Sequence, residues 1–245
     1  MIVVRSCLCV LLMVVTTSTL FGQESGNKQA HPMPGLKHGM CQSPINILTQ
    51  AVAKDTPHSI VLDYKRSTER VRNLGHTIEV EYDAGNTIAF DGKVFDFRQF
   101  HFHTPSEHLV DGVTYPMEMH MVHTLKERNA ENETVYLVIG ALFKQGRENA
   151  FLNEFIRAIP KKVGEETVVR GGTVNVNDLF RLAPKLEFYH YNGSLTTPPY
   201  TETVTWLIIK SVFEASPQQI ETFKRLEGNN ARHVQALFGR KVDSE

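Results

Sequence analysis

The sequence has little cysteine, little tryptophan and almost no net charge. Its 245 residues include three cysteines and one tryptophan, and 26 lysines and arginines nearly balance 27 aspartates and glutamates. A near-neutral balance gives no reason to expect a broad basic surface of the kind that binds nucleic acid or an acidic membrane. We therefore expect neither of them as a partner.

Long apolar runs are also missing. The run from Cys7 to Val15 is shorter than the ~20 apolar residues of a membrane-spanning helix. It follows Arg5 and leads through small polar residues to Gly22, which is the order of a secretory signal peptide. We predict a signal peptide over residues 1–22, a periplasmic or secreted protein, and no membrane contact after removal of the signal. An uncleaved N-terminal anchor is the alternative.

Several common catalytic motifs are absent as well. The chain has no G-x-S-x-G elbow, no phosphate-binding P-loop and no dinucleotide fingerprint. It also has no internal repeat that would divide it. Residues 23–40 are polar and rich in glycine and proline, which predicts a loosely ordered segment. The rest, residues 41–245, has a length that suits a single domain with a sizeable core.

Short alternating or β-branched segments dominate that domain. They predict strands over residues 61–64, 77–82, 87–90, 136–143 and 203–210. Residues 83–86 have the composition of a hairpin turn. Helices are expected over about 149–159 and over about 216–226, with Ser216 as the N-cap of the second. Pattern alone therefore predicts a β-rich domain with a few helices.

The most informative stretch covers residues 99–123 and holds five of the eleven histidines. His101 and His103 are one residue apart in an alternating segment, so both imidazoles project to one face of a strand. A second alternating run, residues 118–122, carries His120, which joins the other two if the strands pair antiparallel. Three neutral imidazoles form a zinc site with a fourth position open to water or substrate. We predict that these three histidines bind Zn²⁺.

Two further residues strengthen this prediction. Metal-bound histidines usually donate their second N–H to a carboxylate, amide or carbonyl. Gln99 lies two residues before His101, and Glu118 lies two before His120, so each shares a strand face with its histidine. A lone strand histidine is more often structural than a ligand. The paired HxH and ExH patterns favour the metal site.

These motifs together resemble the α-class carbonic anhydrases. Besides the histidine block, the resemblance rests on QSPINI at 42–47, NLGHT at 73–77, YNGSLTTPP at 191–199, Trp206 and NAR at 230–232, and it covers roughly residues 41–240. It implies a mainly β fold with a large twisted, mostly antiparallel central sheet and a few surface helices. It also implies reversible hydration of carbon dioxide to bicarbonate and a proton by zinc-bound hydroxide.

The resemblance implies roles for further residues. Thr196 would accept a hydrogen bond from the hydroxide and donate one to Glu107, which orients the nucleophile. Thr197 would contact solvent or bicarbonate. Carbon dioxide has no charge and hydrogen-bonds weakly, so its site should be apolar. The residues that match the family's apolar wall are Val122, Val138, Leu195, Val204 and Trp206.

Proton export has its own expected residue. His76 matches the family's proton shuttle, and a histidine titrates in the range that this role needs. Leu74 and Glu79 stand at neighbouring positions that often carry amides, so the water network is expected to differ. A backbone carbonyl at Asn230 would orient His103.

The chain departs from the family at two places. Residues 23–40 lack the usual aromatic element near the active-site rim. Many secreted and bacterial members also pair a cysteine before QSPINI with one after the two prolines. Here Cys41 stands at the first position and Tyr200 at the second. Once residues 1–22 are removed, Cys41 is alone and no intrachain disulfide can form. We expect a monomer with a mostly buried free thiol, and a Cys41–Cys41 link between chains is the alternative.

Two other functions are compatible with these residues. A catalytically inactive carbonic-anhydrase-like binding module is one, although such domains typically lack a zinc ligand and all three are present here. A zinc esterase is the other, although no polar motif for a larger substrate is evident.

Overall fold

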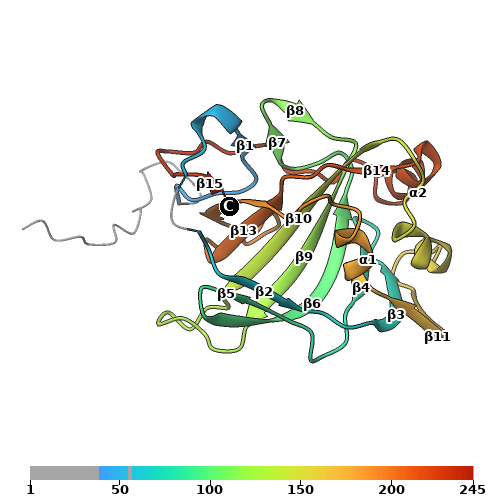
Figure 1. Ribbon diagram of the computed structural model, residues 1–245. Coiled ribbons are helices and arrows are strands. Elements are labelled where there is room, and N and C mark those ends of the chain that lie inside the picture. Colours follow the sequence, from blue (N-terminus) through green and yellow to red (C-terminus); the bar gives the residue numbers. More distant parts are fainter. Residues whose placement is uncertain (1–38, 55–56, 245) are drawn as a thin grey trace, which may run out of the picture.

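The computed structural model describes residues 39–54 and 57–244, which fold around one large twisted β-sheet (Figure 1). The expected mainly β fold is confirmed. The predicted signal peptide over residues 1–22 and nearly all of the segment 23–40 lie outside the described residues. Within the described ranges, every helix is too short or too polar to cross a membrane.

Within the part of the chain that the structure describes, twelve strands make up the main sheet. They are β2 (Ile60–Asp63), β3 (Ser67–Asn73), β4 (Ile78–Glu81), β5 (Thr87–Phe90), β6 (Lys93–His103), β9 (Met117–Leu125), β10 (Tyr136–Gln145), β11 (Glu166–Val174), β12 (Phe188–Gly193), β13 (Val204–Ile209), β14 (Phe213–Ala215) and β15 (Asp243–Ser244). The small second sheet contains β1 (Asn46–Ile47), β7 (Leu109–Val110) and β8 (Val113–Thr114). The helical elements are the 3-10 turns η1 (Thr49–Ala51), η2 (Leu152–Glu154) and η3 (Ile156–Ala158), and the α-helices α1 (Val176–Phe180) and α2 (Pro217–Glu227).

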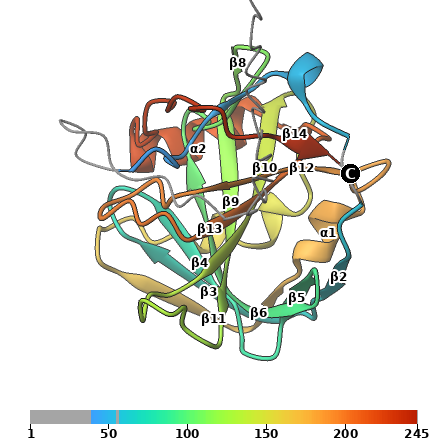
Figure 2. The same ribbon diagram turned by 90° about the vertical axis from the view of Figure 1, so that its left-hand side faces the viewer.

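The long path through the main sheet runs β11-β3-β4-β6-β9-β10-β13-β12-β15. Most neighbours pair antiparallel, as expected, but β10 pairs parallel with both β13 and β14. The sheet is therefore mixed. The helices α1 and α2 lie outside it (Figure 2).

The structure corrects two local predictions. Residues 83–86 form a turn, but β4 and β5 on either side of it both pair with β6 and not with each other, so it is not a hairpin. The helix expected over 149–159 is two 3-10 turns, η2 and η3, with Phe155 between them at φ −137°. The buried Phe155 ring packs on Phe102 and Phe223, and this tertiary contact outweighs the local helical preference.

The second predicted helix is confirmed. Helix α2 begins after Ser216, whose hydroxyl accepts from the Gln219 N–H while the Gln219 side chain accepts from the Ser216 N–H. This reciprocal cap satisfies two donors that a helix start leaves free. The proline at the first helical position needs no N–H partner.

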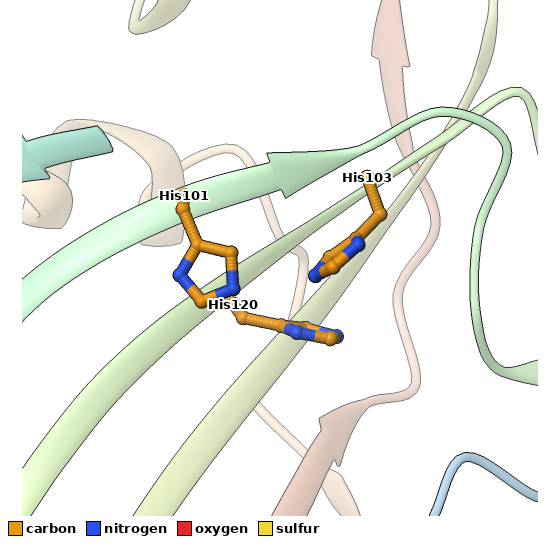
Figure 3. A group of neighbouring side chains, drawn as sticks. All are labelled: His101, His103 and His120. Atoms are coloured by element: carbon orange, nitrogen blue, oxygen red, sulfur yellow. The ribbon is translucent and has the colours of Figure 1, made fainter. Parts of the chain in front are cut away.

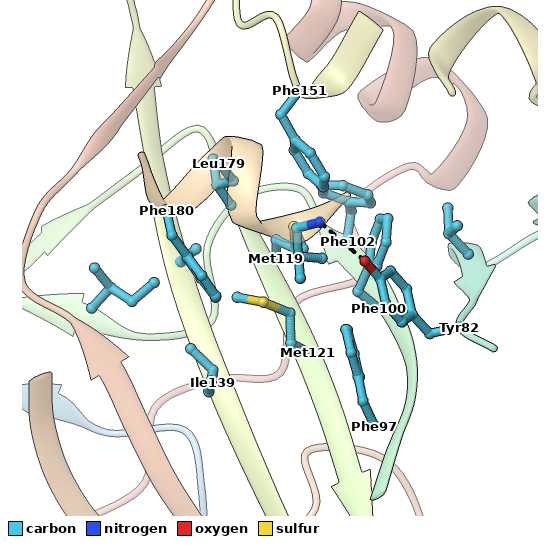
Figure 4. Packing of buried hydrophobic residues seen from close by; sticks show 14 of the residues in the cluster. Tyr82, Phe97, Phe100, Phe102, Met119, Met121, Ile139, Phe151, Leu179 and Phe180 are labelled. Atoms are coloured by element: carbon cyan, nitrogen blue, oxygen red, sulfur yellow. Dashed lines mark hydrogen bonds between the residues drawn. The ribbon is translucent and has the colours of Figure 1, made fainter. Parts of the chain in front are cut away.

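Alternation along β9 separates the two faces of the sheet. Met117, Met119 and Met121 enter the larger hydrophobic cluster, among the phenylalanines of β6 and the residues of α1 (Figure 4). His120 and Val122 therefore face the other side, where the smaller cluster around Trp206 lies. A slip by one residue would exchange the two sets, so the packed core fixes which face carries the histidines.

The thiol of Cys41 differs from expectation. It is free, as predicted, but half-buried instead of mostly buried. The backbone N–H of Cys41 donates to Glu202 at 3.0 Å, and burial together with the Glu202 charge raises the pKa of the thiol. The monomeric state of the protein stays a prediction.

Candidate metal centre

Three of the predicted residues converge on one face of the sheet. His101 and His103 come from β6 and His120 from the adjacent β9, and their rings turn toward one another (Figure 3). His101 and His120 are direct partners in the strand register. One ligand nitrogen from each ring lies within 4.8 Å of the other two. The strand geometry thus gathers the three histidines that the sequence pattern selected.

Neighbouring side chains orient two of the rings. His101 Nδ1 donates to Gln99 Oε1 at 2.9 Å, and His120 Nε2 donates to Glu118 Oε1 at 2.9 Å. A carboxylate can only accept, so the proton of His120 sits on Nε2. The nitrogens left for a metal are Nε2 of His101 and Nδ1 of His120. This is the arrangement that the sequence positions of Gln99 and Glu118 predicted.

The third ring, His103, has a different environment. It is buried, and neither of its nitrogens makes a hydrogen bond within the described residues. Burial and the neighbouring His120 and His101 lower the pKa of His103, and the backbone of Asn230 acts in the opposite direction. The Asn230 side chain holds the surrounding backbone, since it accepts from the Thr104 N–H at 2.9 Å and donates to the carbonyl of His76 at 2.7 Å. A buried ring without partners has nitrogen available for a metal.

Burial controls the charge of these histidines. It lowers the pKa of His101 to about 3, helped by the nearby His120, and holds the pKa of His103 well below its usual range. Burial also opposes a charge on His120, but the Glu118 carboxylate outweighs it and the pKa of His120 is raised. His101 and His103 are therefore neutral at pH 7, which is the state that binds a metal.

Glu118 is the centre of a buried network behind the site. The side chain is fully buried and accepts from the Glu107 N–H at 2.9 Å, the His108 N–H at 2.8 Å, and ring nitrogens of His108 at 2.7 Å and His120 at 2.9 Å. Burial opposes its charge, but these partners hold the pKa of Glu118 well below its usual range. The carboxylate that orients His120 is thus itself fixed.

The network continues to residues whose part in it the sequence did not indicate. The Tyr191 hydroxyl lies 2.6 Å from His108 Nε2 and donates to Ser43 Oγ at 2.9 Å. Ser43 stands in the QSPINI segment and Tyr191 in the YNGSLTTPP segment. These segments are informative only as family motifs. No local periodicity connects positions 43, 108 and 191.

Glu107 and Thr196 are brought together as expected. A hydrogen bond from the Thr196 side chain lowers the pKa of Glu107, and Glu107 Oε1 accepts from the Arg232 N–H at 2.8 Å. Burial outweighs these two hydrogen bonds and the nearby His120, which also lowers the pKa, and the pKa of Glu107 is raised to about 7. Glu107 Oε2 lies 3.6 Å from His103 Nε2 and 3.8 Å from His120 Nδ1. The pair therefore borders the space between the histidines.

A pocket of about 460 Å³ opens onto this space. Its wall includes His101 and His103, the predicted shuttle His76, and Thr197. His76 is exposed, and its Nδ1 donates to the Leu74 carbonyl at 3.1 Å, which leaves Nε2 free to accept a proton. Leu74 and Glu79, the two departures noted near the shuttle, also line this pocket.

The five predicted wall residues form one apolar group on the histidine face. Val138, Val204 and Trp206 are buried in the smaller hydrophobic cluster, and Val122 and Leu195 pack against it. The Trp206 ring lies 4.8 Å from the His120 ring, centroid to centroid. None of the five belongs to the wall of the 460 Å³ pocket in the described part of the chain. The apolar group therefore adjoins the histidine triad through the Trp206 ring.

Glu227, at the end of α2, adds a titrating group to the pocket wall. It accepts from the Ile78 N–H at 2.8 Å through Oε1, its Oε2 makes no hydrogen bond within the described residues, and burial raises its pKa to about 8. A carboxyl whose folded pKa is raised stabilises the fold fully only below its unfolded pKa near 4.3, and this contribution is lost as pH rises toward 8. Glu227→Gln removes the charge and keeps an oxygen for Ile78.

We expect Glu227→Gln to match the wild type below about pH 4 and to be more stable at pH 9, by on the order of 3 kcal/mol. Urea unfolding of the metal-free proteins at several pH values measures the difference. Glu221→Gln, an exposed change on the same helix, is the matched control and should show no such trend. Parallel stability curves for Glu227→Gln and wild type would refute the assignment.

Comparison with known proteins adds an independent line of evidence. The family model described as eukaryotic-type carbonic anhydrase matches residues 26–245. A carbonic anhydrase of Neisseria gonorrhoeae is 39% identical over 210 residues, which is 83% of this chain and 77% of that protein. One of Pectobacterium carotovorum is 36% identical over 234 residues, 93% of this chain and 91% of that protein. The structure of the α-carbonic anhydrase from Thermovibrio ammonificans, in complex with the inhibitor sulfanilamide, is similar with a TM-score of 0.76 and 38% identity, over 83% of this chain and 87% of that one.

Proposed function

The chain belongs to the eukaryotic-type carbonic anhydrase family, and on that premise we propose that it hydrates carbon dioxide through a zinc ion held by His101, His103 and His120. It is an enzyme, a carbonic anhydrase, so the alternative of an inactive binding module is set aside. The observation that carries the zinc proposal is the buried His103 ring, whose nitrogens have no partner among the described residues although two other imidazoles converge on it.

The donor set fits zinc. Zinc prefers nitrogen and sulfur ligands in a four-coordinate site, and catalytic sites use three protein ligands. His101 and His103 are kept neutral by burial, and the rings of His101 and His120 are held by Gln99 and Glu118. Such outer partners fix the ring orientation and raise the basicity of the ligand.

A zinc ion in this site would supply a hydroxide nucleophile at neutral pH, because it lowers the pKa of water to about 7. The role proposed for Thr196 follows from its partner. When Glu107 is ionised it can only accept, so the Thr196 hydroxyl proton is committed to Glu107. The Thr196 oxygen can then only accept from the nucleophile, which orients the attacking lone pair.

The remaining predicted residues are an apolar group and one polar side chain, Thr197. The apolar group of Val122, Val138, Leu195, Val204 and Trp206 lies beside His120, and we assign carbon dioxide to it because that molecule has no charge to solvate. Thr197 lies in the wall of the open pocket, where a hydroxyl can hydrogen-bond to departing bicarbonate.

X-ray diffraction from crystals of the mature protein, measured above and below the zinc absorption edge, tests the ligand set. We expect an anomalous peak at 2.0–2.1 Å from His101 Nε2, from His120 Nδ1 and from one nitrogen of His103. Density for zinc elsewhere, with none among these three rings, would remove the basis of the proposal.

The proton shuttle gives a kinetic prediction. His76 is exposed at the pocket with a free Nε2. Because proton export follows the hydration step, His76→Ala should lower kcat by about tenfold or more in dilute buffer, and kcat/KM should stay nearly unchanged. Stopped-flow CO₂ hydration measures both, and added imidazole should restore part of kcat. His233→Ala, a change at another exposed histidine, is the control. Equal falls in both parameters would mean that His76 shapes the site and carries no proton.

We also propose that the enzyme is exported to the periplasm or secreted. The support is the order of charge, apolar run and small residues over residues 1–22. N-terminal sequencing of the protein recovered outside the cytoplasm tests it, with a start near residue 23 expected. A cytoplasmic protein that retains residues 1–22 would contradict it.

A further inference from the structure

A second group of metal-ligand side chains lies away from the histidine triad. One ligand atom from each of His58, His190 and Asp243 lies within 4.8 Å of the other two. His190 of β12 and Asp243 of β15 are direct partners in the strand register, and His58 comes from the segment that leads into β2. The group therefore joins three segments far apart in sequence, near the C-terminal end seen beside β12 (Figure 2).

This group lies on the opposite face of the main sheet from the triad. Tyr191 contacts His108, on the side of His120. Side chains alternate along a strand, so the adjacent His190 points the other way. In agreement, the His190 ring lies 5.3 Å from the Phe90 ring, which belongs to the larger hydrophobic cluster. The two groups of ligands are thus separate sites.

The distances suit a single small ion. His190 Nδ1 donates to the two Asp243 oxygens at 3.0 and 3.2 Å, and His58 Nε2 lies 3.4 Å from Asp243 Oδ1. A tetrahedral ion with ligands at 2.0–2.1 Å has ligand–ligand separations of about 3.3 Å. The observed separations are close to that value. A bound ion would take the place of the proton that His190 Nδ1 directs at Asp243, and that proton would move to Nε2 of the ring or to solvent.

His58 is already held in the orientation of a ligand. Its Nδ1 donates to Asp91 Oδ2 at 2.7 Å, so the lone pair of Nε2 points away from Asp91. Asp91 is fixed in turn, because its other oxygen accepts from the Ser59 N–H at 2.9 Å. A carboxylate behind a histidine is the usual outer partner of a metal-bound imidazole.

The opposite nitrogen of His58 has no hydrogen-bond partner. Nε2 is buried, makes no hydrogen bond within residues 39–54 and 57–244, and faces the Asp243 carboxylate. A positive charge between this nitrogen and the carboxylate removes the repulsion between them, and either a proton on Nε2 or a bound metal ion supplies it. The side chains of His58, His190 and Asp243 remain 19%, 12% and 14% exposed, so an ion can reach them from solvent.

We propose that His58, His190 and Asp243 form a second metal site, which binds a divalent transition ion such as Zn²⁺ and completes its coordination with water. Two imidazoles and one carboxylate suit zinc, copper or nickel and do not suit magnesium or calcium, which prefer all-oxygen sites. The ion connects the C-terminal strand β15 and the segment before β2 to β12. It binds only the folded chain, because unfolding separates the three ligands, and so it stabilises the fold.

Metal counting on the mature protein tests the proposal. After dialysis against micromolar Zn²⁺ and removal of free ion, we expect two zinc ions per chain for the wild type and one for Asp243→Asn and for His190→Gln. CO₂ hydration should be unchanged in both variants, which also shows that they fold. His233→Gln, a change at an exposed histidine outside the group, should still bind two. The same number of zinc ions in the wild type and in Asp243→Asn would overturn the proposal.

Thermal unfolding of the wild-type protein gives a second test, and Asp243→Asn serves as its control. Zinc added beyond the first equivalent should raise the Tm of the wild type by a few degrees, as expected for a ligand that binds only the native state. Asp243→Asn should show no rise. A wild-type Tm that does not respond to the second equivalent would contradict the stabilising role.

Discussion

His120→Ala should reduce kcat/KM for CO₂ hydration on the order of 1,000-fold or more, because it removes one of three metal ligands at the centre of the site. The substitution also leaves Glu118 Oε1 without one of its two partners. Two imidazoles and water hold zinc far more weakly than three imidazoles, so the bound ion should be lost at ordinary free zinc concentrations. Stopped-flow CO₂ hydration and zinc counting on the same preparation measure the two effects.

The control for this variant is His233→Ala, which removes an exposed histidine and should leave activity and zinc content intact. The zinc content of His120→Ala should fall by one ion per chain. Full activity with undiminished zinc would show that the metal is held elsewhere.

Glu118→Ala should cause the largest loss of stability of any single change near the site, about 3–5 kcal/mol in the free energy of unfolding. The carboxylate is fully buried and accepts four hydrogen bonds, so its removal leaves the Glu107 and His108 N–H groups buried without partners. The His120 ring also loses its orienting partner, and zinc affinity should fall by roughly 10–100-fold.

Urea unfolding of the metal-free protein and competition with a chelator measure these two effects. Glu118→Gln is the informative second variant, because it keeps the shape and loses the charge. The pKa of Glu118 is depressed in the fold, so its contribution is present above the unfolded pKa near 4.3 and is lost as pH falls below it. The stability gap between wild type and Glu118→Gln should therefore close on acidification. A gap that is the same at pH 7 and pH 3.5 would argue against an electrostatic role.

The sequence predicted the local part of the site well. A period of two in residues 99–103 and 118–122 places His101, His103 and His120 on common strand faces, and the same rule places Gln99 and Glu118 beside them. The apolar residues between them, such as Met119 and Met121, are what hold that face in register. These features depend on residues that are close together in the sequence, so the alternation of residue types can predict them.

Pairing between distant segments could not be predicted in this way. Nothing in residues 136–145 indicates that β10 pairs parallel with β13, or that residues 83–86 join two strands that both pair with β6. The helix expected over 149–159 breaks at Phe155 because that ring packs into the core. Tertiary contacts of this kind outweigh local propensity.

The same limit applies to the polar networks. The connection from Glu118 through His108 to Tyr191 joins positions that share no sequence pattern. Likewise His58, His190 and Asp243 carry no recognisable spacing, and only the fold brings them together. Long-range clusters need the strand register, which the sequence alone does not supply.

The most direct test of a zinc-dependent carbonic anhydrase is stopped-flow CO₂ hydration by the mature protein before and after metal removal by a chelator. Activity should disappear with the metal and return when Zn²⁺ is added back to the dialysed protein, while Mg²⁺ should restore none because imidazole sites do not suit it. A protein that is shown to be metal-free by mass spectrometry and still hydrates CO₂ at its original rate would disprove catalysis by a zinc ion at His101, His103 and His120.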